Sequence, residues 1–169
     1  MDAVCSSEEL STTLLDLLRG IDFGRRYFAF YEALPKHRAG SGYKVGRKEL
    51  GAALAETGLD FRYFAGEKFF QHVEHHPRCD IMLHVRFRYS QAEFMLYVKA
   101  GSAIAGGPYP RLALLVVQTN DPDFSPDPPY PKLPFSDEAG LREVVRFGVS
   151  LFAEARDAIL AYAENKSRE

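Results

Sequence analysis

The 169-residue sequence has no tryptophan, only two cysteines and almost no net charge. Cys5 and Cys79 are too few for the disulfide framework that holds many small secreted domains together. With 21 basic and 23 acidic residues the formal charge is −2, which argues against bulk electrostatic attraction to nucleic acid or to an anionic membrane. No stretch approaches the roughly 18 consecutive apolar residues that a membrane span needs.

The N-terminus lacks the features of a secretion signal. Its first ten residues, MDAVCSSEEL, place acidic side chains where a signal peptide would have positive charge followed by an apolar run. Arginine outnumbers lysine, and alanine and glycine are plentiful, which is typical of GC-rich bacterial genomes. We therefore expect a soluble bacterial protein of the cytoplasm.

The chain nevertheless has ample material for a core. Hydrophobic residues make up 46% and aromatic residues 13% of the sequence, so a disordered tail is excluded. Neither an internal repeat nor a linker divides the chain. We expect one globular domain over residues 1–169.

Helical spacing dominates the first third of the sequence. Ser6 and Glu9 fit a capping box, and leucines then follow along one face at Leu10, Leu14, Leu17 and Leu18. Residues 21–34 fit helical and strand patterns, but the helical set spans more residues and predicts a helix. A short helix near residues 50–54 and a first strand within 59–64 follow, and residues 67–76 are predicted to form a helical turn or an irregular edge.

A β-hairpin over residues 81–98 is the clearest element. Apolar residues alternate with polar ones in both arms, as in a sheet with one buried face. A turn around Ser90 and Gln91 would place Phe87 opposite Phe94 and Val85 opposite Leu96 on the inner face. The same register would place Arg88 opposite Glu93 and His84 opposite Tyr97 on the outer face.

The last third combines an apolar run, a loop and a long helix. Residues 112–117 are apolar on both faces and predict a central strand, covered by helices or by a second copy of the chain, which leaves a homodimer open. Residues 120–135 hold six of the ten prolines and predict a loop. Ser136 is the expected cap of a helix reaching about residue 165. Its expected buried stripe is Leu141, Val145, Gly148, Phe152, Ala155, Ile159 and Tyr162.

These patterns together predict an α+β fold. It comprises an antiparallel β-meander of about three to five strands, N-terminal helices, and a long C-terminal helix packed on the sheet.

Histidines cluster around the start of the hairpin, where four of the five lie within residues 72–84. On a helix, His72 and His76 would share a face, and Cys79 could complete a zinc site or act as a thiolate nucleophile. Against both, Val73 breaks the metalloprotease pattern H-E-x-x-H, and Pro77 would interrupt the helix. We expect no cofactor and no catalytic residues, with a zinc- or thiol-dependent enzyme at these three residues as the alternative.

Nucleic-acid signals are weaker. The basic loop over residues 36–48 does not match the phosphate-binding pattern G-x-x-x-x-G-K-[ST], and the aromatic run at 26–30 departs from the RNP1 motif at its glycine position. These departures argue against a nucleic-acid partner.

The proline-rich segment over residues 120–138 combines five acids with large apolar residues. Prolines reduce the entropy lost on ordering, and aromatics beside acids suit an interface whose other side is basic. Residues expected to bind a partner are Asp121, Asp123, Phe124, Asp127 and Tyr130, with Arg86, Arg88 and Tyr97 on the outer hairpin face. Leu133 and Phe135 equally fit a role in the core.

The functional hypothesis is a non-enzymatic protein-binding module. Its most concrete form is a bacterial immunity-type protein that neutralises a cognate toxin by stoichiometric binding of a basic toxin domain through an acidic surface. A chaperone or adaptor for a secreted protein is a further alternative.

Overall fold

The alternating apolar residues in the middle of the chain form one antiparallel sheet. A computed structural model describes residues 5–38 and 40–169, so the first four residues of the acidic N-terminal stretch lie outside the described residues. The strands follow one another across the sheet in chain order: β1 (Arg62–Phe64), β2 (Phe69–His75), β3 (Asp80–Arg88), β4 (Gln91–Ala100) and β5 (Ala103–Pro108). Far along the chain, β6 (Leu133–Pro134) pairs with the first residues of β4.

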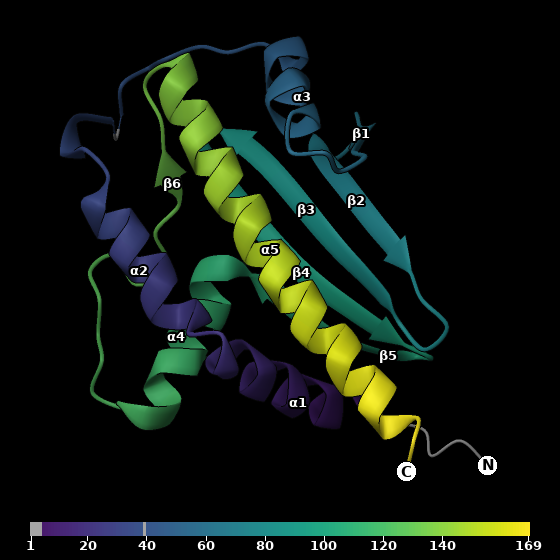
Figure 1. The fold of residues 1–169 in the computed structure, drawn as a ribbon. Helices are drawn as coiled ribbons and strands as arrows, with labels where there is room; N and C mark the ends of the chain where they lie inside the picture. Colours follow the sequence, from purple (N-terminus) through teal and green to yellow (C-terminus); the bar gives the residue numbers. More distant parts are fainter. Residues whose placement is uncertain (1–4, 39) are drawn as a thin grey trace.

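Helices cover this sheet on one side. They are α1 (Ser7–Gly20), α2 (Phe23–Ala33), α3 (Arg47–Ala55), α4 (Tyr109–Asn120) and α5 (Glu138–Lys166), with a short 3-10 helix at Lys36–Arg38. In Figure 1, α5 crosses the sheet diagonally, α3 lies near the β1 edge, and α1, α2 and α4 lie toward the β5 edge. The predicted α+β fold with a β-meander, N-terminal helices and a long C-terminal helix is confirmed.

Both terminal helices are capped by side chains. The predicted capping box of α1 is present, because Ser6 Oγ accepts from the Glu9 N–H at 3.1 Å and the Glu9 carboxylate accepts from the Ser6 N–H at 2.8 Å. The cap of α5 is Asp137, whose carboxylate accepts from the Gly140 N–H at 2.7 Å. The prediction of Ser136 was wrong by one residue, since the aspartate reaches the free N–H groups of the first turn.

The sheet-facing stripe of α5 is buried as predicted as far as Ile159, but Tyr162 is 38% exposed. The helix extends past the sheet at that point, and most residues of its last two turns are exposed. Close approach to the sheet depends on Gly148, because a Cβ at this position would overlap the ring of Phe94 on β4.

The predicted central strand over residues 112–117 is wrong, because this segment lies in α4. Almost all of its residues are buried, and Pro110 occupies the first turn of the helix, where its missing N–H costs no hydrogen bond. Within residues 112–117 only Leu115 is exposed, so this stretch has no polar position. Its sequence therefore cannot be distinguished from a buried strand by periodicity.

The hairpin has the predicted faces but a register shifted by two residues. Val85 lies opposite Phe94, and Arg86 lies opposite Glu93. The turn is formed by Tyr89 and Ser90 with φ of 52° and 57°, a left-handed pair that closes a two-residue hairpin. A shift of two residues keeps every side chain on its face, which is why the alternation alone did not reveal it.

Residues 67–76 were also predicted wrongly, because β2 occupies most of this segment. Phe70 and His72 face the core, while Phe69 and Gln71 face outward with partial exposure. The histidines and glutamate at the end of this strand obscured the alternation in the sequence.

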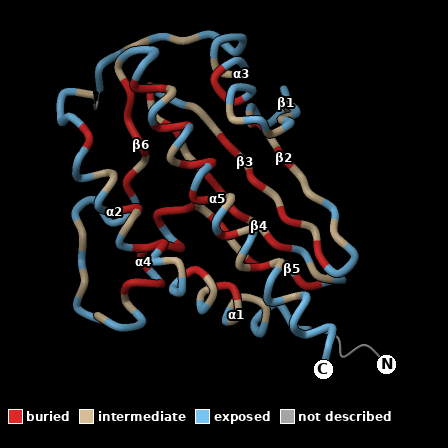
Figure 2. The backbone as a smooth tube through the Cα atoms, viewed as in Figure 1, coloured by how far each residue is buried: buried red, intermediate tan, exposed pale blue. Residues whose placement is uncertain are grey.

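The two faces of the sheet have different surroundings. The inner face contributes Ile81, Leu83, Val85, Phe94 and Leu96 to the continuous core with α5 and α4, and Figure 2 shows the buried positions running along β3, β4 and the adjoining side of α5. Within the described residues no helix packs on the outer face.

Candidate functional site

The segment that links α4 to α5, residues 121–137, is termed the acidic loop. Its first anchor is Phe124, whose ring packs edge-on against Phe28 of α2 at a centroid distance of 5.2 Å and whose carbonyl accepts from the Gln118 side chain at 3.0 Å. Its second anchor begins at Pro131, whose carbonyl accepts from the buried Tyr27 hydroxyl at 2.5 Å. Burial raises the pKa of Tyr27, so this hydroxyl keeps its proton and remains a donor.

The second anchor continues into the sheet. Leu133 and Phe135 are fully buried, and β6 hydrogen-bonds to β4. Of the two roles that the sequence left open for these residues, the structure supports the core role.

The acidic loop exposes polar side chains both directly before its first anchor and between the two anchors. Asp123 and Asp127 are exposed, Tyr130 is 56% exposed, and Asp121 is half-exposed with Arg25 3.9 Å away. An ion pair at this distance and exposure adds little stability. Figure 1 shows the loop running alongside α2 before it rejoins the sheet at β6. The loop is therefore held at Phe124 and at Pro131, with Asp127 and Tyr130 between these anchors and Asp123 directly before the first.

The histidine cluster has a different geometry from the predicted one. His72 lies on β2 and His76 just beyond its end, so the two do not share a helix face. Both meet Glu74 instead: His72 Nε2 lies 3.1 Å from one carboxylate oxygen and His76 Nε2 lies 3.4 Å from the other. His72 is 8% exposed, and its Nδ1 faces the carbonyl of Asp60 at 2.8 Å.

Arg156 of α5 completes this cluster through an Nη1 contact of 3.1 Å to Glu74. Among the residues that the structure describes, no group of three His, Cys, Asp or Glu side chains is placed to hold a metal ion. The arrangement ties β2 to α5.

Cys79 is buried at the start of β3. Burial and the neighbouring charge of Asp80 both raise the pKa of its thiol. A nucleophilic cysteine needs a lowered pKa instead, which increases the fraction of thiolate.

The outer sheet face contains the predicted Arg86, Arg88 and Tyr97, and also aromatic residues that the sequence analysis did not single out. Phe64 and Phe69 stack at a centroid distance of 5.0 Å, and Phe69 stacks on His84 at 4.7 Å. Phe69 was missed because β2 was not recognised as a strand. A shallow depression of about 230 Å³ lies here, lined by Phe69, His84, Met95, Arg86 and Glu67.

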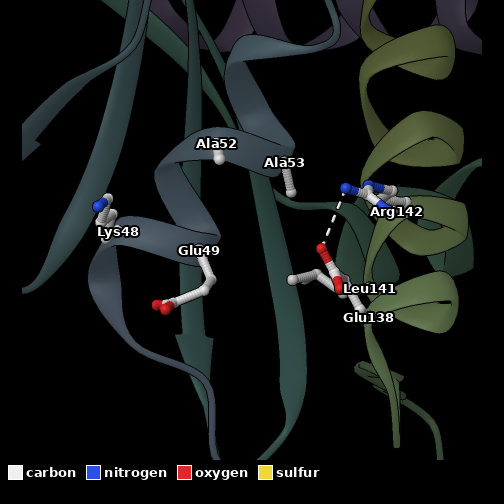
Figure 3. Close-up of a pocket in the computed structure, with 7 residues that line it drawn as sticks. All are labelled: Lys48, Glu49, Ala52, Ala53, Glu138, Leu141 and Arg142. Atoms are coloured by element: carbon white, nitrogen blue, oxygen red, sulfur yellow. Dashed lines mark ion pairs between the residues drawn. The ribbon is translucent and has the colours of Figure 1, made fainter.

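A second depression, of about 190 Å³, lies between α3 and α5. Figure 3 shows Lys48 and Glu49 on its α3 side and Glu138 and Arg142 on its α5 side. Arg142 pairs with Glu138 at 3.0 Å and with Glu56 at 3.1 Å. The pair with Glu138 lies within α5, and the pair with Glu56 joins α5 to the end of α3 across the rim.

No protein family, curated protein or solved structure matches this chain. Its function therefore has to be inferred from its own residues. In the described part of the chain, no helix combines the length and apolar character needed to cross a bilayer.

Proposed function

We propose that the protein is a non-enzymatic binding module that engages another protein stoichiometrically through the acidic loop. In its most concrete form, it is a cytoplasmic immunity-type protein whose acidic surface occludes the active site of a basic toxin domain. The observation that carries the proposal is the anchoring of the loop at Phe124 and at Pro131, with exposed Asp127 and Tyr130 between these anchors and exposed Asp123 directly before the first.

This anchoring supports binding for a thermodynamic reason. A loop that is already held in place loses little conformational entropy when a partner binds, so more of the contact energy appears as affinity. Aromatic residues at the centre of an interface contribute most of the binding energy, and Tyr130 is available for this role. Carboxylates around it accelerate association with a basic partner.

The test is capture of the partner from the native lysate at high salt, with identification by mass spectrometry. The loop variant combines Asp121→Asn, Asp123→Asn, Asp127→Asn and Tyr130→Ser. The matched control removes the same groups elsewhere, through Glu8→Gln, Glu164→Gln, Glu169→Gln and Tyr162→Ser. We expect one dominant protein near one equivalent, retained by the control and lost by the loop variant.

The immunity role further requires that the captured protein be toxic. Expression of the captured protein alone should arrest growth, and co-expression of the wild-type chain should restore it, whereas the loop variant should not. Equal retention by the loop variant and the control would overturn the acidic loop as the binding site. A captured protein that is harmless when expressed alone would overturn the immunity role.

A further inference from the structure

The outer sheet face carries a row of rings that crosses four neighbouring strands. It begins at Phe64 on β1, continues through Phe69 on β2 and His84 on β3, and ends at Tyr97 on β4. The guanidinium of Arg62 lies over the Phe64 ring, 5.0 Å from its centroid. A continuous aromatic row on a sheet face without a covering helix is typical of an interaction surface.

The stacking determines what such a row can bind. Its ring spacings of 4.7 to 5.1 Å match the distance of about 4.8 Å between neighbouring strands. Phe64, Phe69 and His84 therefore direct their faces at one another and their edges toward solvent. Nucleobases bind single aromatic rings by stacking on their faces, and these faces are already occupied. Ring edges carry partial positive charge, which favours apolar groups and carboxylates.

The charges around the row favour the same class of partner. The outer positions of β1, β3 and β4 carry Arg62, Arg86, Arg88 and Lys99, against Asp80 and Glu93. Asp80 lies 2.8 Å from His75, and Glu93 is shared by Arg86 and Lys132 at 3.5 and 3.9 Å. Arg88 and Lys99 are exposed at opposite ends of the hairpin. With Glu67 of the adjoining turn, which lines the depression on this face, four cations stand against three carboxylates, so the face is slightly positive in a chain whose net charge is −2.

Flexible apolar side chains fill the space around the row. Met82 and Met95 lie beside His84 and Tyr97 on this face, and Ile104 of β5 is 52% exposed. Methionines adjust their shape to different apolar partners.

We propose that the outer sheet face is a second interaction surface, distinct from the acidic loop, and that its occupant is a protein segment carrying apolar side chains interspersed with carboxylates. This proposal does not depend on the function of the acidic loop, because the loop residues proposed to bind there, Asp121, Asp123, Asp127 and Tyr130, have the opposite charge and are not part of the outer face.

Fluorescence anisotropy of labelled peptides tests the proposal. The probe alternates leucine or phenylalanine with glutamate, its counterpart has lysine at every glutamate position, and an oligothymidylate represents single-stranded nucleic acid. We expect the acidic peptide to bind at least tenfold more tightly than the other two probes. Sedimentation of the free protein reports whether the face is instead covered by a second copy.

Two variants locate the binding on the face. Arg88→Glu with Lys99→Glu reverses two exposed charges and should weaken binding of the acidic peptide at least tenfold. Lys48→Glu with Lys166→Glu makes the same change of net charge on α3 and α5 and should leave binding within about twofold. Phe69→Ala with Tyr97→Ala, in protein that retains its circular dichroism spectrum, should also weaken binding.

Four results would overturn the proposal. They are equal or tighter binding of the basic peptide, tighter binding of the oligothymidylate, equal loss in both charge-reversal variants, and a dimer that the Phe69 and Tyr97 changes dissociate.

Discussion

Arg156 on α5 and Glu74 on β2 are 82 residues apart in the sequence, yet the Arg156 guanidinium lies 3.1 Å from the Glu74 carboxylate. The same carboxylate meets His72 and His76. One acidic side chain thereby connects the long helix, the second strand and the turn that follows it. This connection is partly buried, where hydrogen bonds to a charged group are stronger than at the surface.

We expect Glu74→Gln to make stability less dependent on acid pH. Burial opposes ionisation of Glu74, but the hydrogen bonds from His72, Arg156 and His76 outweigh it and lower its pKa below the ordinary value of 4.5. A carboxyl whose pKa is lower in the folded state contributes stability above its unfolded pKa and loses it as the pH falls. The variant should lose about 1 to 3 kcal/mol of unfolding free energy at neutral pH.

Urea unfolding at about pH 7 and about pH 3 measures this effect, and the difference between wild type and Glu74→Gln should shrink at the lower pH. Glu164→Gln, at an exposed position of α5, should match wild type at both. A Glu74→Gln deficit that stays constant with pH would contradict the assignment.

Gly148→Ala should destabilise the protein. A Cβ at this position would overlap the ring of Phe94, so α5 or the ring would have to move. Overpacking of this kind costs about 1 to 3 kcal/mol. Gly20→Ala provides the control, because a Cβ there meets no atom within 4 Å and alanine favours helix. Urea unfolding of both variants is the measurement, and equal stabilities would show that α5 does not approach β4 as closely as described.

The hairpin turn predicts a stabilising substitution. Tyr89 has a φ of 52° and is 77% exposed. The neighbouring Arg88 guanidinium lies over its ring, but at this exposure the contact adds little, and the backbone adopts a conformation that asparagine tolerates better. Tyr89→Asn should raise the unfolding free energy by about 0.5 to 1 kcal/mol, and Tyr89→Val should lower it. Equal unfolding free energies of the valine and asparagine variants would contradict a left-handed backbone at Tyr89.

His84 should make the protein less stable in mild acid. Burial lowers the pKa of His84 and the charge of Glu67 only partly opposes it, so the folded state holds the neutral ring and Gln71 donates to it at 2.9 Å. The contribution of this site to the unfolding free energy is fully present above the ordinary histidine pKa of 6.5. It falls as the pH drops below that value.

Thermal unfolding at about pH 7.5 and about pH 5.5 should therefore show a smaller pH response in His84→Phe than in wild type. Phenylalanine preserves the stacking partner of Phe69. His37→Asn, at an exposed position, should respond as wild type does, and a His84→Phe response equal to that of wild type would refute the prediction.

Features that depend on local spacing could be predicted from the sequence. The capping box of α1, the two faces of the hairpin and the stripe of α5 as far as Ile159 follow from periods of 3.6 and 2 residues, which act within a few residues of each other. The register of the hairpin was predicted wrongly because its turn consists of Tyr89 and Ser90 and has neither the glycine nor the asparagine that usually marks such a turn. The helix α4 was not predicted because residues 112–117 are all apolar, which leaves no periodicity to read.

The candidate surfaces were predictable only in part. Exposure of Asp123, Asp127 and Tyr130 follows from a proline-rich acidic stretch. The aromatic row was not foreseen, because it joins Phe64 and Phe69 to His84 and Tyr97 through strand pairing between distant segments. The contact between Glu74 and Arg156 has the same origin, and no local pattern contains it.

Because the acidic loop is anchored at two points, the stability of the fold depends little on which residues lie between the anchors. Phe124 and Pro131 contact α2, and residues 125–130 between them are mostly exposed. Lengthening a loop whose ends are fixed has a small entropic effect, about 0.6 kcal/mol for each doubling. Residues between the anchors can therefore be exchanged, or further ones inserted, while the sheet and helices stay as they are. The fold thus provides a constant frame on which part of the proposed binding surface, including Asp127 and Tyr130, could change through substitutions at six positions.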